Sequence, residues 1–317
     1  NPFQRMRGVE PPSRAWEARV IAVIRHPLKQ VLILRRYCRH RTGNLSTGPS
    51  GCTILIMTNT REYTRVGVVN PFDAPVYFTD ETDSTMIDAR ILAERGEPDG
   101  TVIFAGMQTA GRGRIAGRVW ESAPHESLLC TVIFRRKPDP VITLRTGLAV
   151  AQTYSRFIPS RGDIAVKWPN DVLFRGKKLA GILCESDGST ILVAAGLNLA
   201  QKSFPEHLAD KASSLRLARE AFSGQTVFPS LPLPADVLPV FLTELSSALA
   251  EPFWNRKLSS LLWKRNEPVR FVSGDPDTGE TVNGTVSGIG QTGELLISTG
   301  SAEAPGVRSF WSGEISY

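Results

Sequence analysis

A short segment rich in glycine and arginine, residues 108–120, constrains the fold of this chain more than any other stretch. It holds three arginines and three glycines and follows directly on the apolar run 101–107. Glycine lets main-chain N–H groups approach a ligand closely, and each guanidinium offers a planar fork of donors to carboxylate or phosphate oxygens. The pattern predicts a strand that delivers a loop to an anionic ligand, with Trp120 able to stack on a flat ring. A solvent-exposed basic loop is the plainer alternative.

Length and composition indicate a globular protein with a large core. The chain has 317 residues, of which 41% are hydrophobic, which suits one large domain with a smaller one, or two domains. The four cysteines lie far apart without a CxxC pair, so we expect no disulfide framework and no metal site, and a reducing cytoplasmic location. No apolar run reaches the roughly 18 residues of a membrane span, and we expect no membrane partner.

The first 56 residues are strongly basic, with ten arginines and lysines against two glutamates. Such a segment could bind nucleic acid. We expect instead a leader that lies outside the native protein, because the chain begins with Asn1 and the composition changes at Met57. Residues 1–75 show no pattern of two helices joined by a turn, so we expect no nucleic-acid partner.

Strands and helices are predicted in turn after Met57. Residues 76–78 read as a short strand. Ser84 and Thr85 then supply N-cap groups to a helix that ends at Gly96, with Ile87, Ile91 and Leu92 on its buried face. The apolar runs 101–107 and 127–134 predict paired strands, and residues 141–157 predict a buried helix.

Residues 164–199 predict a meander of strands, with turns at 175–178 and near Gly188. Lys167 follows the apolar residues 164–166, where a lone ammonium costs several kcal/mol unless an anion meets it. Lys167 is therefore expected to face an anionic partner. Asn170 places an amide at a strand end where a ligand could be reached, with an ordinary turn as the plainer alternative. Gly196 and Asn198 place a small residue and an amide within the apolar strand 194–199, which suggests close approach of a ligand.

The C-terminal part changes from helices to short strands. Residues 235–266 predict helices broken at Pro252. The runs 269–272, 281–289, 294–298 and 307–315 predict a small all-β barrel. We therefore divide the chain into a leader (1–56), a large domain (57–266) and a C-terminal domain (267–317).

Four motifs together resemble the biotin protein ligase family, also called biotin–acetyl-CoA-carboxylase ligase. They are the Gly/Arg loop 111–120, Lys-Trp-Pro-Asn-Asp at 167–171, Lys-Leu-Ala-Gly-Ile-Leu at 178–183 and Gly-Leu-Asn at 196–198. The resemblance runs from about Val76 to the C-terminus. The sequence departs from the family pattern by an additional residue in the loop and by Met86 after the Ser-Thr pair.

The resemblance implies an α+β fold: a mixed or antiparallel sheet with helices, like a class II synthetase, and a small SH3-like C-terminal β-barrel. It also implies a two-step reaction in which biotin and MgATP give biotinyl-5′-AMP, after which a lysine of the biotin carboxyl carrier protein, a subunit of acetyl-CoA carboxylase, receives the biotin. ATP and Mg²⁺ are then required, and biotin is a substrate. The resemblance leaves open whether the chain forms a homodimer.

The resemblance also implies roles for individual residues. The residues implied for catalysis are Lys167, Arg114 and Arg112. The residues implied for biotin binding are Ser84, Thr85, Gln108, Arg112, Gly113, Arg114 and Lys167. Those implied for ATP binding are Arg114, Arg118, Trp120, Asn170, Lys178 and Asn198. The loop is expected to fold over the adenylate, because a mixed anhydride hydrolyses if water reaches it.

Three alternatives remain at this point. A lipoate–protein ligase would share the fold and a lysine, but would not be expected to carry the Gly/Arg loop together with residues 167–171. A biotin ligase that also represses transcription would need a DNA-binding segment before residue 75. A non-enzymatic adaptor built on the C-terminal domain would leave the lysine and arginine cluster unexplained.

Overall fold

The computed structural model describes part of the chain in full atomic detail and part by its backbone. The backbone is described for residues 16–26, 29–38, 54–57 and 62, and backbone with side chains for residues 63–115, 117–222, 229–300 and 306–315. The chain forms two compact units. One comprises Asn1–Gly67 with Tyr77–Thr79, and the other comprises Val68–Val76 with Asp80–Tyr317. The domain boundaries expected at residues 56 and 266 stay predictions.

The first unit contains an antiparallel meander that the sequence analysis did not predict. Its strands are β1 (Trp16–His26), β2 (Lys29–Cys38), β3 (Ile54–Met57) and β4 (Glu62–Val66). The β1–β2 hairpin pairs Trp16 with Cys38 at its open end, and its register shifts once, between Val20 and Ala22. The β-branched residues Val20, Ile21, Val23 and Ile24 of β1 suit such a ribbon. Apart from Gly67, every described residue of Asn1–Gly67 lies in one of these four strands.

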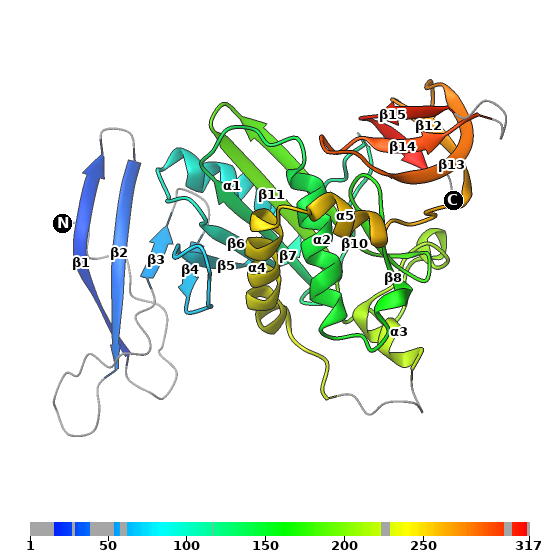
Figure 1. Ribbon diagram of the computed structural model, residues 1–317. Helices are drawn as coiled ribbons and strands as arrows, with labels where there is room; N and C mark the ends of the chain where they lie inside the picture. The colour runs from blue at the N-terminus through cyan, green and yellow to red at the C-terminus, as the bar shows by residue number, and fades with distance from the viewer. Residues whose placement is uncertain are drawn as a thin grey trace. The chain divides into compact units, whose positions relative to one another are not determined.

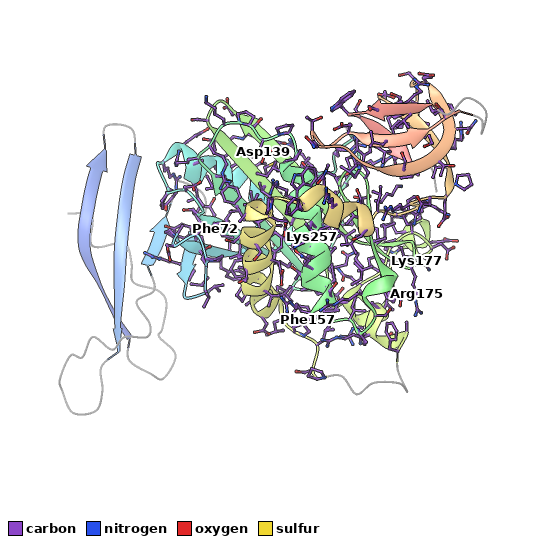
Figure 2. The ribbon with its side chains drawn as sticks, viewed as in Figure 1. Phe72, Asp139, Phe157, Arg175, Lys177 and Lys257 are labelled. Carbon is purple, nitrogen blue, oxygen red and sulfur yellow. The ribbon has the colours of Figure 1, made fainter. Side chains whose placement is uncertain are left out.

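Six strands of the second unit form its main sheet, in the order β6-β7-β11-β10-β9-β8. They are β6 (Val102–Gln108), β7 (Ser127–Phe134), β8 (Ile164–Lys167), β9 (Asp171–Phe174), β10 (Lys177–Asp187) and β11 (Thr190–Asn198). All neighbours pair antiparallel. The predicted β6–β7 pairing and the 164–199 meander are confirmed. Figure 2 shows Arg175 and Lys177 at the turn between β9 and β10.

Helices cover this sheet and bury its central strand. β7 is buried along its whole length, as expected for a strand covered on both faces. Figure 1 shows α2 and α4 lying side by side across the sheet. The helices are α1 (Thr85–Glu94), α2 (Ile142–Ser155), α3 (Leu215–Glu220), α4 (Pro234–Ala250) and α5 (Trp254–Ser260), with 3₁₀ turns η2 (Arg161–Asp163) and η3 (Glu206–Leu208). Within the described residues, no helix has the length and apolar character needed to span a bilayer.

The buried face of α1 differs from the prediction. Its N-cap is Ser84, and Gly96 follows its end with φ +88°, as predicted. The residues buried against the sheet include Met86, Ala89 and Leu92, however, whereas Ile87 and Ile91 are only half-buried. Apolar spacing allowed either of two neighbouring stripes of the helix that share Leu92, and packing against β6, β7 and β11 buries the stripe that also carries Met86 and Ala89.

The C-terminal part forms a five-stranded antiparallel sheet in the order β15-β14-β13-β12-β16. Its strands are β12 (Pro268–Ser273), β13 (Thr281–Ile289), β14 (Leu295–Ser298), β15 (Val307–Phe310) and β16 (Gly313–Ile315). The prediction of a single strand over 307–315 is wrong, because the chain turns at Trp311 and Ser312 and enters β16 through Gly313, whose φ of +140° favours glycine. β15 and β16 therefore lie at opposite edges of the sheet.

Candidate functional site

One cavity of about 870 Å³ in the second unit gathers every site residue predicted from the sequence. Its walls come from the start of α1, the ends of β6 and β8, strands β10 and β11, the Gly/Arg loop and β16. Its volume lies within the range of small-molecule sites. The predicted residues on its wall are Ser84, Thr85, Gln108, Arg112, Gly113, Arg114, Arg118, Trp120, Lys167, Asn170, Lys178 and Asn198.

The start of α1 supplies a chain of small polar groups to one part of the wall. Ser84 accepts a hydrogen bond from the Met86 backbone N–H at 3.3 Å, so the hydroxyl caps the helix and keeps its own O–H as a donor. Thr85 donates its N–H and its hydroxyl to Oε1 of Gln108, both at 2.9 Å. Thr131 donates in turn to the Thr85 hydroxyl at 2.9 Å. These bonds orient the Gln108 amide at the end of β6.

The Gly/Arg loop forms a narrow hairpin. Arg112 and Val119 form an isolated antiparallel bridge, and the Gly113 N–H donates to the Arg118 carbonyl at 2.8 Å. Gly117 adopts φ +81° near its tip, which explains one of the three glycines. The loop is therefore folded back on itself and presents its arginines to the cavity.

Two of these arginines contact β16. Arg114 Nη2 donates to the Gly313 carbonyl at 3.2 Å. Arg118 meets the Glu314 carboxylate with both terminal nitrogens, at 3.3 and 3.0 Å. Such a paired contact fixes geometry as well as charge. The C-terminal strand thus forms part of the cavity wall.

Lys167 lies at the end of β8 and is 2% exposed. Its Nζ is 3.7 Å from Oε1 of Glu314 and 5.4 Å from the centre of the Trp263 ring. Burial lowers the pKa of Lys167 from 10.5 to about 8, against the attraction of Glu314 and of Asp171. The prediction that Lys167 faces an anion is therefore met within the protein itself. The site holds this ammonium in a place that favours arriving negative charge.

Glu314 lines the cavity but is not among the individual site residues inferred from the sequence, which singled out only its segment, Trp311–Glu314. Burial by itself would raise the pKa of its carboxyl group, but the hydrogen bonds from Arg118 and the charges of Lys167, Arg118 and Arg114 hold that pKa below its usual value. Glu314 lies 196 residues after Arg118. A single glutamate in a short strand has no local signal that would connect it to the loop.

Trp120 closes the cavity over two glycines of neighbouring strands. A Cβ atom on Gly196 would come within 2.8 Å of the indole, and one on Gly181 within 2.9 Å. Lys178 Nζ lies 5.6 Å from the centre of the ring. The close approach explains the glycine in β11 that the sequence marked out. The buried Nε1 makes no hydrogen bond within the described residues, so an acceptor on a ligand would satisfy it.

The two asparagines serve the backbone. The Asn170 side chain donates to the Ile182 carbonyl at 3.0 Å, and the Asn198 side chain donates to the Ser213 carbonyl at 3.0 Å. Lys178 forms an ion pair with Asp171 at 2.7 Å. These contacts shape the wall, and the ATP-binding roles of the three predicted residues stay predictions. In the described part of the chain, His, Cys, Asp and Glu form no cluster able to hold a metal ion.

Comparison with known proteins places the chain in a family. Residues 77–201 match the biotin/lipoate A/B protein ligase family. The bifunctional ligase/repressor BirA of Bacillus spizizenii is 32% identical over 255 residues, which cover 75% of this chain and 72% of that protein. The chain belongs to the biotin protein ligase family. The biotin–[acetyl-CoA-carboxylase] ligase of Mycobacterium tuberculosis is 39% identical over 142 residues, covering 43% of this chain and 52% of the relative.

Solved structures agree with this membership of the biotin protein ligase family. The biotin protein ligase from Aquifex aeolicus, in complex with biotin and ATP, is 27% identical and has a TM-score of 0.60. The match covers 76% of this chain and 97% of that one. The family and fold class predicted from the four motifs are confirmed, and the chain is a biotin protein ligase.

Proposed function

We propose that this ligase joins biotin to ATP, giving biotinyl-5′-AMP and pyrophosphate, and then transfers biotin to a lysine of a biotin carboxyl carrier domain of acetyl-CoA carboxylase. The observation that carries the proposal is Lys167, a buried ammonium on the wall of a cavity that also receives Arg112 and Arg114. The name of the relative from Mycobacterium tuberculosis supports this acceptor. We place the reaction in the cytoplasm, which supplies ATP.

In the first step a biotin carboxylate oxygen attacks the α-phosphorus of ATP, and the bond from phosphorus to the pyrophosphate oxygen breaks. Two like charges about 4 Å apart repel by roughly 4 kcal/mol at an effective dielectric of about 20. Lys167 supplies a compact positive charge between them, and Arg112 and Arg114 supply donors for the phosphate oxygens. Mg²⁺ enters as part of the MgATP substrate.

In the second step the ε-amine of the acceptor lysine attacks the acyl carbon, and AMP leaves. The adenylate must be kept from water until then. The Gly/Arg hairpin, which Arg114 ties to the Gly313 carbonyl of β16, supports a closed site during this interval. No covalent bond to the protein is needed.

Biotinylation of an isolated carrier domain tests the proposal. The protein is incubated with biotin, MgATP and the carrier domain, and pyrophosphate release is measured beside carrier biotinylation. The expected result is that both products form and that Lys167→Ala removes both. A protein that releases no pyrophosphate and labels no carrier would refute the proposal, and the same assay with lipoate in place of biotin distinguishes the lipoate alternative.

We propose a ligase without the repressor function of BirA. Residues 16–26, 29–38, 54–57 and 62–66 lie in strands, so no helix of a DNA-reading pair falls within these described ranges. Gel retardation at two salt concentrations provides the test, since binding through phosphates weakens steeply as salt rises. A specific complex that survives the higher salt concentration would restore the repressor alternative.

A further inference from the structure

Three acidic residues on the cavity wall are paired with cations. Asp171 pairs with Lys178, and Glu185 with Arg90. Glu314 differs from these two, because its carboxylate contacts both Arg118 of the loop and Lys167 of the strand end. It is also the acidic residue that comes from the C-terminal sheet.

We propose that Glu314 is a displaceable counter-anion, which occupies the position between Lys167 and Arg118 until the anionic groups of the substrates take its place. The inference rests on the proposed function, because that reaction brings a carboxylate and an α-phosphate to Lys167. Glu314 is then a specificity-determining residue: it sets how much negative charge a ligand must bring in order to enter.

The geometry of the ion pairs supports an exchange. The contact of Glu314 with Lys167 is 3.7 Å, which is longer than a charge-assisted hydrogen bond, whereas that with Arg118 is 3.0 Å. The Glu314 side chain is 22% exposed, so it can swing toward solvent. A second anion placed beside Lys167 would repel this carboxylate.

The net charge of the groups around Glu314 also supports an exchange. Lys167, Arg114, Arg118 and Lys178 bring four positive charges to this part of the wall, and Glu314 and Asp171 neutralise two. The remaining positive charge attracts an anion, and Glu314 competes with it. An exchange at Glu314 releases Arg118 from β16, whereas Arg114 keeps its bond to the Gly313 carbonyl, so the loop stays attached to this strand.

The test compares Glu314→Gln with a matched control, Glu280→Gln. Glu280 belongs to the same C-terminal part and binds Arg308 through two bonds of 2.9 Å, but it does not line the cavity. Each substitution removes a charge and keeps the shape of the side chain. Affinities for biotin and for its neutral primary amide are measured by titration calorimetry on the full-length protein at pH 7 and low salt.

We expect Glu314→Gln to bind biotin about two- to fivefold more tightly than the parent, while its affinity for the amide is unchanged. Glu280→Gln should match the parent for both ligands. Biotin and amide affinities that change together in Glu314→Gln would show a structural role and overturn the proposal. Unchanged biotin affinity would overturn it equally.

A second measurement needs no ligand. Tryptic cleavage of the loop at Arg112, Arg114 and Arg118 should be faster in Glu314→Gln than in Glu280→Gln, because the counter-anion no longer holds the loop. Equal rates would contradict the role of Glu314. A parent protein that binds no biotin would instead contradict the proposed function, and the cleavage rates would still decide the inference.

Discussion

Replacing Lys167 by methionine is expected to stabilise the folded protein and to abolish adenylate formation. Methionine preserves much of the length and flexibility of the side chain without its charge. The gain in stability and the loss of activity are expected together, because a lysine that is kept for catalysis lowers the stability of the fold that holds it. Glu314 keeps Arg118 as a partner in the variant.

The stability gain follows from the pKa of the buried ammonium. The folded protein lowers the pKa of Lys167 from 10.5 to about 8, a difference that corresponds to about 3 kcal/mol at pH 7. Between pH 8 and 10.5 the unfolded chain holds a proton that the folded protein has released, so the stability of the parent rises with pH there. The gain in the variant is therefore complete below pH 8 and disappears above about pH 10.5.

The loss of activity follows from the charge between the two substrates. Removing it restores a repulsion of roughly 4 kcal/mol, which slows adenylate formation by about a thousandfold. Transfer from separately supplied biotinyl-AMP should suffer less, because the two anions have already been joined. Lys167→Arg should recover only part of the rate, since a planar fork does not replace a compact ammonium.

Urea unfolding followed by tryptophan fluorescence, at pH 7 and pH 10, measures the first outcome, and pyrophosphate release measures the second. Lys177→Met serves as the control: Lys177 lies half-exposed at the turn before β10, and its replacement should change the free energy of unfolding by about 0.5 kcal/mol or less. A Lys167→Met protein that is less stable than the parent at pH 7, or that makes adenylate at the parental rate, would refute the reasoning.

Three further predictions concern the same wall. Arg114→Ala should release biotinyl-AMP into a filtrate faster than the parent, because a charge-assisted bond worth about 1.5–3 kcal/mol is lost; equal leakage would contradict a role for Arg114 in retention. Gly196→Ala should displace the Trp120 indole and raise the KM for biotin or ATP at least severalfold. The control is Gly162→Ala, whose new Cβ would have its nearest neighbour at 4.0 Å and which should leave both KM values unchanged. Trp168→Phe removes the bond of 3.0 Å from Nε1 to the Gly293 carbonyl together with part of a buried ring. It should cost at least about 1 kcal/mol in urea unfolding, and an unchanged midpoint would show that neither contributes.

The local features of the site could be predicted from the sequence alone. The Gly/Arg loop, the lysine after the apolar residues of β8 and the strands that deliver both depend on short-range pattern: apolar runs form strands, glycines permit the turn, and an ammonium in an apolar run needs an anion. The four motifs together were sufficient to identify the family. Each of these motifs spans about a dozen residues or fewer along the chain.

Only the tertiary structure decided which parts of the chain meet. Glu314 reaches Arg118 across 196 residues, and Trp168 donates to Gly293 across 125, in pairs that leave no local pattern. Packing likewise selected the buried stripe of α1, and a turn at Gly313 separated β15 from β16. Periodicity shows that a face is buried but not what covers it, because that depends on the placement of other elements. The sequence therefore predicted that Lys167 has an anionic partner, but only the fold determined that this partner is Glu314.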